Sequence, residues 1–286
     1  MTNKFNKITK ITTNLDLSQC PKLETIELTR TNINLEQINL PQLKTLVLSD
    51  NEITDLTPLI QCAQLIKLTI KDIPMNNHSL PSLPKLKKLL ISNAKITDIQ
   101  DILDKYPELT ELAILNEVIP VIQLFKPHNN LMGLILYDSK TQVIENLDKM
   151  LPNLKKLNIS KNKIKNLKGI PRNIEHICAN NNNITNINHI QEYQNIQILH
   201  LSGNGISNIE VLKYLPKLFN LSIKNNKITE IDDLKDCINL KYLFIDGNLI
   251  TSIEPIASLK LEQLSIDKNH KITDLNLINP EIIKYI

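Results

Sequence analysis

The segment NNKITEI at residues 225–231 decides the fold of this chain. Related phrases return at other positions: NEITDL at 51–56, NNITNI at 182–187, NGISNI at 204–209 and NLITSI at 248–253. From 182 onward the phrase recurs about every 22 residues, as expected when one coil of backbone is built repeatedly. The sequence therefore predicts a solenoid, in which each coil packs on its neighbours.

Each phrase belongs to a longer unit, L-x-x-L-x-L-x-x-N-x-I-x-x-I/L. The units begin at residues 23, 43, 65, 86, 109, 131, 154, 174, 196, 218, 240 and 261. Their spacing of 20 to 23 residues covers nearly the whole chain. The L-x-L part alternates apolar and other residues, which indicates a short strand with one buried face. We therefore expect twelve parallel strands in one continuous domain.

The Asn of each unit follows the strand, where the chain turns inward and leaves backbone polar groups buried. A side-chain amide both donates and accepts hydrogen bonds, so a column of Asn can satisfy these groups. Seven units carry it, at Asn51, Asn162, Asn182, Asn204, Asn226, Asn248 and Asn269. We interpret these residues as a structural asparagine ladder.

The remainder of each unit predicts one or two helical or 3-10 turns, as in IQDILDKYPEL at 99–109, followed by a Pro before the next strand. The segment NKITKI at 6–11 reads as the second half of a repeat. We predict an N-terminal cap with this half repeat at 1–22, eleven repeats at 23–260, and the last repeat with the C-terminal end at 261–286.

The consensus and its 22-residue length resemble those of leucine-rich-repeat proteins, and within them the class of the protein phosphatase 1 regulatory subunit and of bacterial internalins. The resemblance implies an α/β solenoid: a right-handed horseshoe with a parallel concave β-sheet and short 3-10 or helical convex segments. The 20-residue unit at 154–173, which ends GIPRN, is similar to the shorter repeats of bacterial effectors.

The composition favours an aliphatic core: 42% of residues are hydrophobic, only 3% are aromatic, and Trp is absent. The net charge of +3 and the lack of like-charge runs favour no nucleic-acid partner. Four Cys without metal-ligand spacing, no export signal and no long apolar run favour a cytoplasmic monomer without membrane contact. A secreted effector is the alternative.

Five units lack the Asn and carry Thr31, Ile73, Ala94, Glu117 or Ser139 instead. Four of these units are consecutive. Drift compensated by water or by altered turns accounts for this pattern, and so does reshaping of the region for a partner. The sequence leaves both interpretations open.

Two clusters on the concave face interrupt an otherwise polar surface. The first is predicted on the fourth to sixth strands and comprises Leu90, Ala113, Leu115, Ile135 and Tyr137. The second, on the eleventh strand, comprises Tyr242, Phe244 and Asp246. An apolar patch with a polar rim, here Lys67, Lys88 and Glu111, is typical of a protein interface. The alternatives are a locally twisted or covered sheet for the first cluster and isolated surface aromatics for the second.

One pair of residues is a candidate for catalysis. Cys178 and His200 are predicted side by side on adjacent strands, with His176 nearby. An open sheet offers neither an oxyanion site nor exclusion of water, so we expect no enzyme, metal or cofactor. The sequence favours a protein-binding module, either an intracellular scaffold or phosphatase-regulator-like subunit or an internalin-like protein that binds a host protein. The resemblance implies the catalytic subunit of protein phosphatase 1, or a host protein, as partner.

Overall fold

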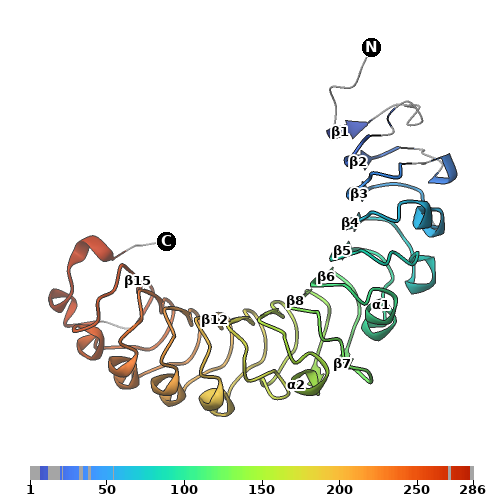
Figure 1. Ribbon diagram of the computed structural model, residues 1–286. Helices are drawn as coiled ribbons and strands as arrows, with labels where there is room; N and C mark the ends of the chain where they lie inside the picture. Colours follow the sequence, from blue (N-terminus) through green and yellow to red (C-terminus); the bar gives the residue numbers. More distant parts are fainter. Residues whose placement is uncertain are drawn as a thin grey trace. The chain divides into compact units, whose positions relative to one another are not determined.

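The computed structural model describes residues 7–11, 20, 22–31, 35–37, 40–53, 55–269 and 272–283. Its contacts divide the chain into two compact units, Met1–Lys140 (unit 1) and Thr141–Ile286 (unit 2). Each is a stack of coils of the predicted kind (Figure 1). The prediction of one continuous domain, with its cap at 1–22 and its end at 261–286, stays a prediction.

Unit 1 contains a parallel sheet in the order β1-β2-β3-β4-β5-β6-β8. The strands are β1 (Lys7–Ile11), β2 (Thr25–Thr29), β3 (Thr45–Ser49), β4 (Lys67–Lys71), β5 (Lys88–Ser92), β6 (Glu111–Leu115) and β8 (Gly133–Tyr137). The short strand β7 (Val121–Gln123) follows β6 in the chain. The connections contain the 3-10 turns η2 (Leu35–Gln37), η3 (Thr57–Gln61) and η4 (Asn77–Ser79), and helix α1 (Ile99–Lys105).

Unit 2 begins with the short strand β9 (Val143–Glu145) and helix α2 (Leu147–Met150). Its parallel sheet runs β10 (Lys156–Asn158), β11 (His176–Cys178), β12 (Ile198–His200), β13 (Asn220–Ser222), β14 (Tyr242–Phe244) and β15 (Gln263–Ser265). Its 3-10 turns are η5 (Asn188–Glu192), η6 (Glu210–Tyr214), η7 (Asp232–Asp236), η8 (Glu254–Ile256), η9 (Leu275–Leu277) and η10 (Pro280–Ile282).

The twelve predicted strands are all present, one in each unit of the repeat, and the fold class is confirmed as a right-handed leucine-rich-repeat solenoid of the α/β type. In β2 the residues Ile26 and Leu28 are fully buried while the alternate side chains are partly exposed, which is the pattern that L-x-L predicts. Within each unit the strands lie on one side of the coils and the helical turns on the other (Figure 1). We call the first side the strand face.

The two ends add to this picture. Residues 7–11 form β1, which pairs in parallel with β2, so they occupy a strand position; the interpretation of 6–11 as the second half of a repeat was wrong. Most of the loop from 12 to 22 lies outside the described residues. At the other end Ile283 forms a parallel bridge to Leu264 of β15, so the C-terminal segment continues the edge of the sheet.

One backbone feature recurs in all twelve coils. The residue directly before the ladder position has a positive φ, between 51° and 68°, and is therefore left-handed. The residues are Arg30, Asp50, Asp72, Asn93, Asn116, Asp138, Lys161, Asn181, Gly203, Asn225, Gly247 and Lys268. No β-branched residue stands at this position, since its side chain would clash in this conformation.

The ladder residues link coils through both atoms of the amide. Asn226 accepts from the backbone N–H of Ile206 at 3.0 Å and donates to the carbonyls of Leu201 at 3.0 Å and Ile223 at 2.9 Å. Asn182, Asn204 and Asn248 make the corresponding bonds. In unit 2 each such carbonyl between Ile159 and Ile245 accepts from two successive Asn side chains.

The units without Asn replace it in different ways. Glu117 is 3% exposed, and its carboxylate accepts from the N–H groups of Ala94 at 2.5 Å and Ile96 at 3.3 Å. Thr31 donates its hydroxyl to Asn51 at 2.9 Å, and Ser139 donates to the carbonyl of Tyr137 at 3.3 Å. Ile73 is fully buried. Thus side-chain oxygens satisfy part of the turn where the amide is missing.

Candidate functional site

The strand face of unit 1 carries the first predicted cluster. In β6 the residues Leu112 and Ile114 point into the core, so Ala113 and Leu115 project outward and are half-buried. The register places Ala113 between Leu90 of β5 and Ile135 of β8. Because paired residues on neighbouring parallel strands lie about 4.8 Å apart, these side chains form a continuous surface.

Leu115 lies next to Tyr137 in the same register, one row along the strands. We call Leu90, Ala113, Leu115, Ile135 and Tyr137 the aliphatic patch. Ile135 is 37% exposed and the other four are half-buried. The structure therefore brings together all five residues that the sequence assigned to this cluster; their role in binding stays a prediction.

Charged residues lie at the strand starts beside the patch. Lys88 and Glu111 are paired in register and form an exposed ion pair of 2.7 Å. Lys67 is exposed at the start of β4. Met132, directly before β8, is 51% exposed and adds an apolar side chain that the sequence analysis missed. Its position immediately before the strand was the available signal.

The second cluster lies on β14 of unit 2 and directly after it. The rings of Phe219 and Tyr242 meet edge to face, with centroids 6.1 Å apart, and the Lys224 ammonium lies 5.2 Å from the centre of the Phe244 ring. The Tyr242 hydroxyl donates to Glu262 at 2.9 Å. The sequence analysis missed Phe219 because this residue stands one position before the outward-facing positions of the strand.

Asp246 differs from its expected exposure, since it is only 7% exposed. Its Oδ1 accepts from the Ser265 hydroxyl at 2.6 Å and from the Asp267 N–H at 3.1 Å. Its Oδ2 lies 3.1 Å from Lys224 Nζ, as an ion pair. The structure thus gives this carboxylate partners within its own sheet, and a contact with a binding partner stays a prediction.

The Cys178–His200 pair exists but lacks the properties of a nucleophile. The Sγ atom lies 3.7 Å from Nδ1 of His200, whose Nε2 lies 3.0 Å from the Asn220 side-chain oxygen. Burial raises the pKa of the Cys178 thiol, and burial together with Lys156 lowers the pKa of His176. Since the thiolate is the reactive form, the raised pKa keeps Cys178 as the unreactive thiol near neutral pH.

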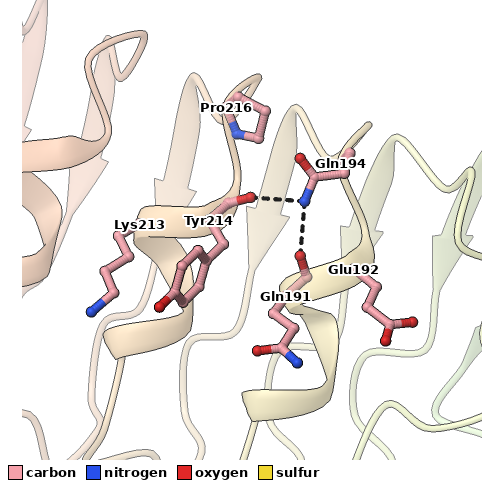
Figure 2. A pocket seen from close by; sticks show the side chains of 6 residues that line it. All are labelled: Gln191, Glu192, Gln194, Lys213, Tyr214 and Pro216. Atoms are coloured by element: carbon pink, nitrogen blue, oxygen red, sulfur yellow. Dashed lines mark hydrogen bonds between the residues drawn. The ribbon is translucent and has the colours of Figure 1, made fainter.

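A recess of about 550 Å³ lies beside η5 and η6, and Figure 2 shows its lining. Gln194 donates to the carbonyls of Gln191 at 2.8 Å and Tyr214 at 3.1 Å. Lys213 is already paired with Glu210 at 3.0 Å and Asp233 at 3.2 Å. The recess is open to solvent, and both Gln194 and Lys213 in its lining already have partners.

Among the described residues, no three His, Cys, Asp or Glu side chains gather as a metal ion would require. Within the same part of the chain, no helix combines the length and apolar character needed to span a bilayer.

Comparison with known proteins follows the same division between fold and function. A family model described as Leucine Rich repeats (2 copies) matches residues 216–258. A curated relative, an acidic leucine-rich nuclear phosphoprotein 32-related protein of Plasmodium falciparum (isolate 3D7), is 33% identical over 75 residues. That match spans 26% of this chain and only 27% of the relative.

Two solved structures are similar over most of the chain. An internalin (InlF) from Listeria monocytogenes has a TM-score of 0.67 and 19% identity, covering 96% of this chain and 83% of its own. The complex of TLR13 with the RNA ssRNA13 has a TM-score of 0.72 and 22% identity, covering 88% and 40%. At these identities the likeness concerns the fold alone. The repeat consensus, the stacked parallel strands and these matches agree that the chain is a leucine-rich-repeat protein.

Proposed function

We propose that this chain is a non-catalytic recognition module that binds a protein partner through the aliphatic patch on the strand face of unit 1. The observation that carries the proposal is the continuous run of outward apolar side chains across β5, β6 and β8. Solvated sheet surfaces are ordinarily polar, whereas apolar surface with a polar rim is typical of interface centres.

The chemistry of the patch favours a protein over a small molecule. The five side chains stand on an open sheet, and a small ligand there would keep much of its surface in water. A protein surface can instead cover all three strands at once. Each apolar side chain moved from full exposure to full burial contributes roughly 1.5 to 3 kcal/mol. Because the patch side chains are already partly buried, each contributes less than this on binding.

Within this function, we propose the role of an intracellular scaffold or phosphatase-regulator-like subunit. The alternative is an internalin-like or effector-like protein whose partner belongs to a host. The aromatic residues on β14 and directly before β13 support a second contact area, since Phe219 meets Tyr242 and Lys224 lies over the Phe244 ring. Aromatic residues are enriched among the residues that dominate binding energy.

The test compares two double variants. Leu115→Asp with Ile135→Asp places two charges in the centre of the aliphatic patch. Val47→Asp with Ser49→Asp places the same charges in the same two rows on β3, outside the patch. Tagged full-length proteins are used to capture partners from a native lysate, with identification by mass spectrometry and confirmation with the purified partner.

We expect the patch variant to capture at least roughly tenfold less of one specific protein, because two buried charges would have to be desolvated. The β3 variant should retain capture, and both should keep the circular dichroism spectrum of the unmodified chain. Equal capture by the two variants contradicts the proposal. A phosphatase catalytic subunit among the captured proteins supports the regulator role, and a host surface protein supports the alternative.

A further inference from the structure

Basic residues are concentrated in one short stretch of unit 2. Residues 149–174 contain eight basic residues and no acidic one, while the remaining 25 basic and 30 acidic residues give the rest of the chain a net charge of −5. The eight are Lys149, Lys155, Lys156, Lys161, Lys163, Lys165, Lys168 and Arg172. A modest total of +3 therefore hides a strongly basic coil.

Neighbouring acidic residues neutralise only part of this charge. Lys155 pairs with Glu175 at 3.1 Å, and Arg172 pairs with Glu192 at 2.6 Å. Lys163 and Lys165 form no ion pair with any residue that the structure describes, and both are exposed. Uncompensated cations gathered on one coil create a positive potential that attracts anionic partners.

Three of these lysines are exposed along the same edge of the coil. From 161 to 165 exposed and buried residues alternate: Asn162 and Ile164 face the core, and Lys161, Lys163 and Lys165 are exposed. We call these three the lysine edge. It lies directly after the strand, where Asn162 joins the ladder by donating to the carbonyl of Ile159 at 2.9 Å. The ladder thus fixes the backbone that carries the lysines.

The two coils that follow the lysine edge are uncharged at the position that matches Lys163. Asn183 and Gly205 stand where Lys163 does, and the coils are joined there by bonds from Asn183 N to Ile164 O and from Gly205 N to Ile184 O, of 2.9 and 2.8 Å. Residues 176–191 contain no Asp or Glu. No acidic residue in this range competes for Lys163 and Lys165.

We propose that the lysine edge binds an acidic, Asp- and Glu-rich segment of a protein. Single-stranded nucleic acid fits less well, because residues 149–174 contain no Phe, Tyr or Trp on which bases could stack. A membrane fits less well too, because no large hydrophobic residue between 144 and 213 is exposed among those described. Lysines with neutral surroundings suit carboxylates on an extended chain.

The experiment measures fluorescence anisotropy of a labelled (Asp-Ser)8 peptide with the full chain at low salt. The test variant is Lys163→Glu with Lys165→Glu. The control is Lys227→Glu with Lys235→Glu, which changes the charge equally; Lys227 occupies the position of Lys163 three coils later. An (Asn-Ser)8 peptide, an RNA oligonucleotide and anionic vesicles are measured alongside.

We expect the acidic peptide to bind and the test variant to weaken binding roughly tenfold, since two attractive contacts become repulsive. The control variant should change it less than about twofold, and added salt should weaken it by screening. No binding of the acidic peptide, equal losses in both variants, or tighter binding of RNA or vesicles overturns the proposal. The variant Leu115→Asp with Ile135→Asp should bind the peptide normally, which separates this surface from the aliphatic patch.

Discussion

Units 1 and 2 build the same coil with different hydrogen bonds. The six strands β2 to β6 and β8 have five residues each, while β10 to β15 have three each. Unit 2 carries an Asn in every coil from Asn162 to Asn269, whereas four consecutive coils of unit 1 lack it. The coil geometry therefore does not depend on one particular polar residue.

The difference in strand length reflects which groups, backbone or side chain, bond to the backbone after the strand centre. In unit 1, Ser49 and Lys71 are still paired in register as strand residues. In unit 2 side chains share this role: Lys161 N still donates to Asn180 O at 2.8 Å, but Asn180 N donates to the Ser160 hydroxyl at 3.2 Å, and Ser202 N donates to the Asn180 side chain at 2.8 Å. Ser49 and Ser160 occupy matching positions, so residue type alone does not decide which arrangement forms.

The comparison also separates two kinds of surface. In the two rows that hold the aliphatic patch on β5, β6 and β8 of unit 1, unit 2 presents polar side chains such as Asn158, Ser160, Asn180 and Ser202. Ser160, Asn180 and Ser202 each accept a hydrogen bond from a backbone N–H of the next coil, and Asn158 accepts one from Ser160 in its own coil. The longer strands of unit 1 pair through their backbones up to these rows.

The largest expected effect concerns the ladder of unit 2. Asn226→Ala removes one acceptor for Ile206 N, but the carbonyls of Leu201 and Ile223 each keep a second amide donor, Asn204 or Asn248. We expect a loss of about 2 kcal/mol in the free energy of unfolding for the single variant. Asn226→Ala with Asn248→Ala strips Ile223 O of both donors, so the loss should exceed the sum of the singles by about 1 kcal/mol.

The matched control is Asn182→Ala with Asn226→Ala, whose side chains share no carbonyl. Its losses should add. Denaturant unfolding gives the free energies, and hydrogen exchange locates the opening coils within unit 2. Additive losses in the adjacent pair would show that the shared carbonyls carry no coupling.

A smaller effect is expected at the left-handed position. Gly203 has φ of +68°, and an added Cβ would collide with the Asn181 side-chain oxygen. Gly203→Ala should destabilise unit 2 by about 1 to 2 kcal/mol, because both the backbone and the contact are strained. In unit 1 a Cβ on Gly133 would meet only Glu111 Cγ, at 3.5 Å. Gly133→Ala should therefore change thermal stability little; equal shifts in Tm for both variants would contradict this account.

The smallest effect depends on pH and concerns the buried carboxylate of unit 1. Burial raises the pKa of Glu117, opposed by the N–H groups of Ala94 and Ile96. A carboxyl whose folded-state pKa is raised contributes its stability below the unfolded pKa and loses it as the pH rises through the folded pKa. Glu117→Gln should thus gain stability relative to the unmodified chain as the pH rises from about 4 to 7.

The measurement is the difference in unfolding free energy between the two proteins at each pH. Subtraction removes the contributions of the groups that titrate in both proteins. Glu108→Gln, at an exposed position, serves as the control. A difference that is constant over this range, or that shrinks with pH, would show that burial does not govern Glu117.

The sequence predicted the repeat, the strand centres and the ladder positions because these rest on apolar periodicity and on recurrent Asn. It did not predict the burial of Asp246, which depends on Ser265 and Lys224 in neighbouring coils. Strand length also escaped prediction, since it depends on side-chain bonds between coils. The basic coil at 149–174 was readable by counting charges coil by coil, but the whole-chain total concealed it.

The left-handed residue that precedes every ladder position makes the coils interchangeable modules. Excision of the two coils at residues 203–246 would join Ser202 to Gly247, and Gly247 has the same left-handed backbone as the Gly203 that it replaces, with φ of 64° against 68° and no Cβ to meet the Asn181 side chain. The flanking coils would meet with their side-chain amides still in register. A chain of this design can therefore gain or lose such coils, and so lengthen or shorten its sheet, without a new kind of junction.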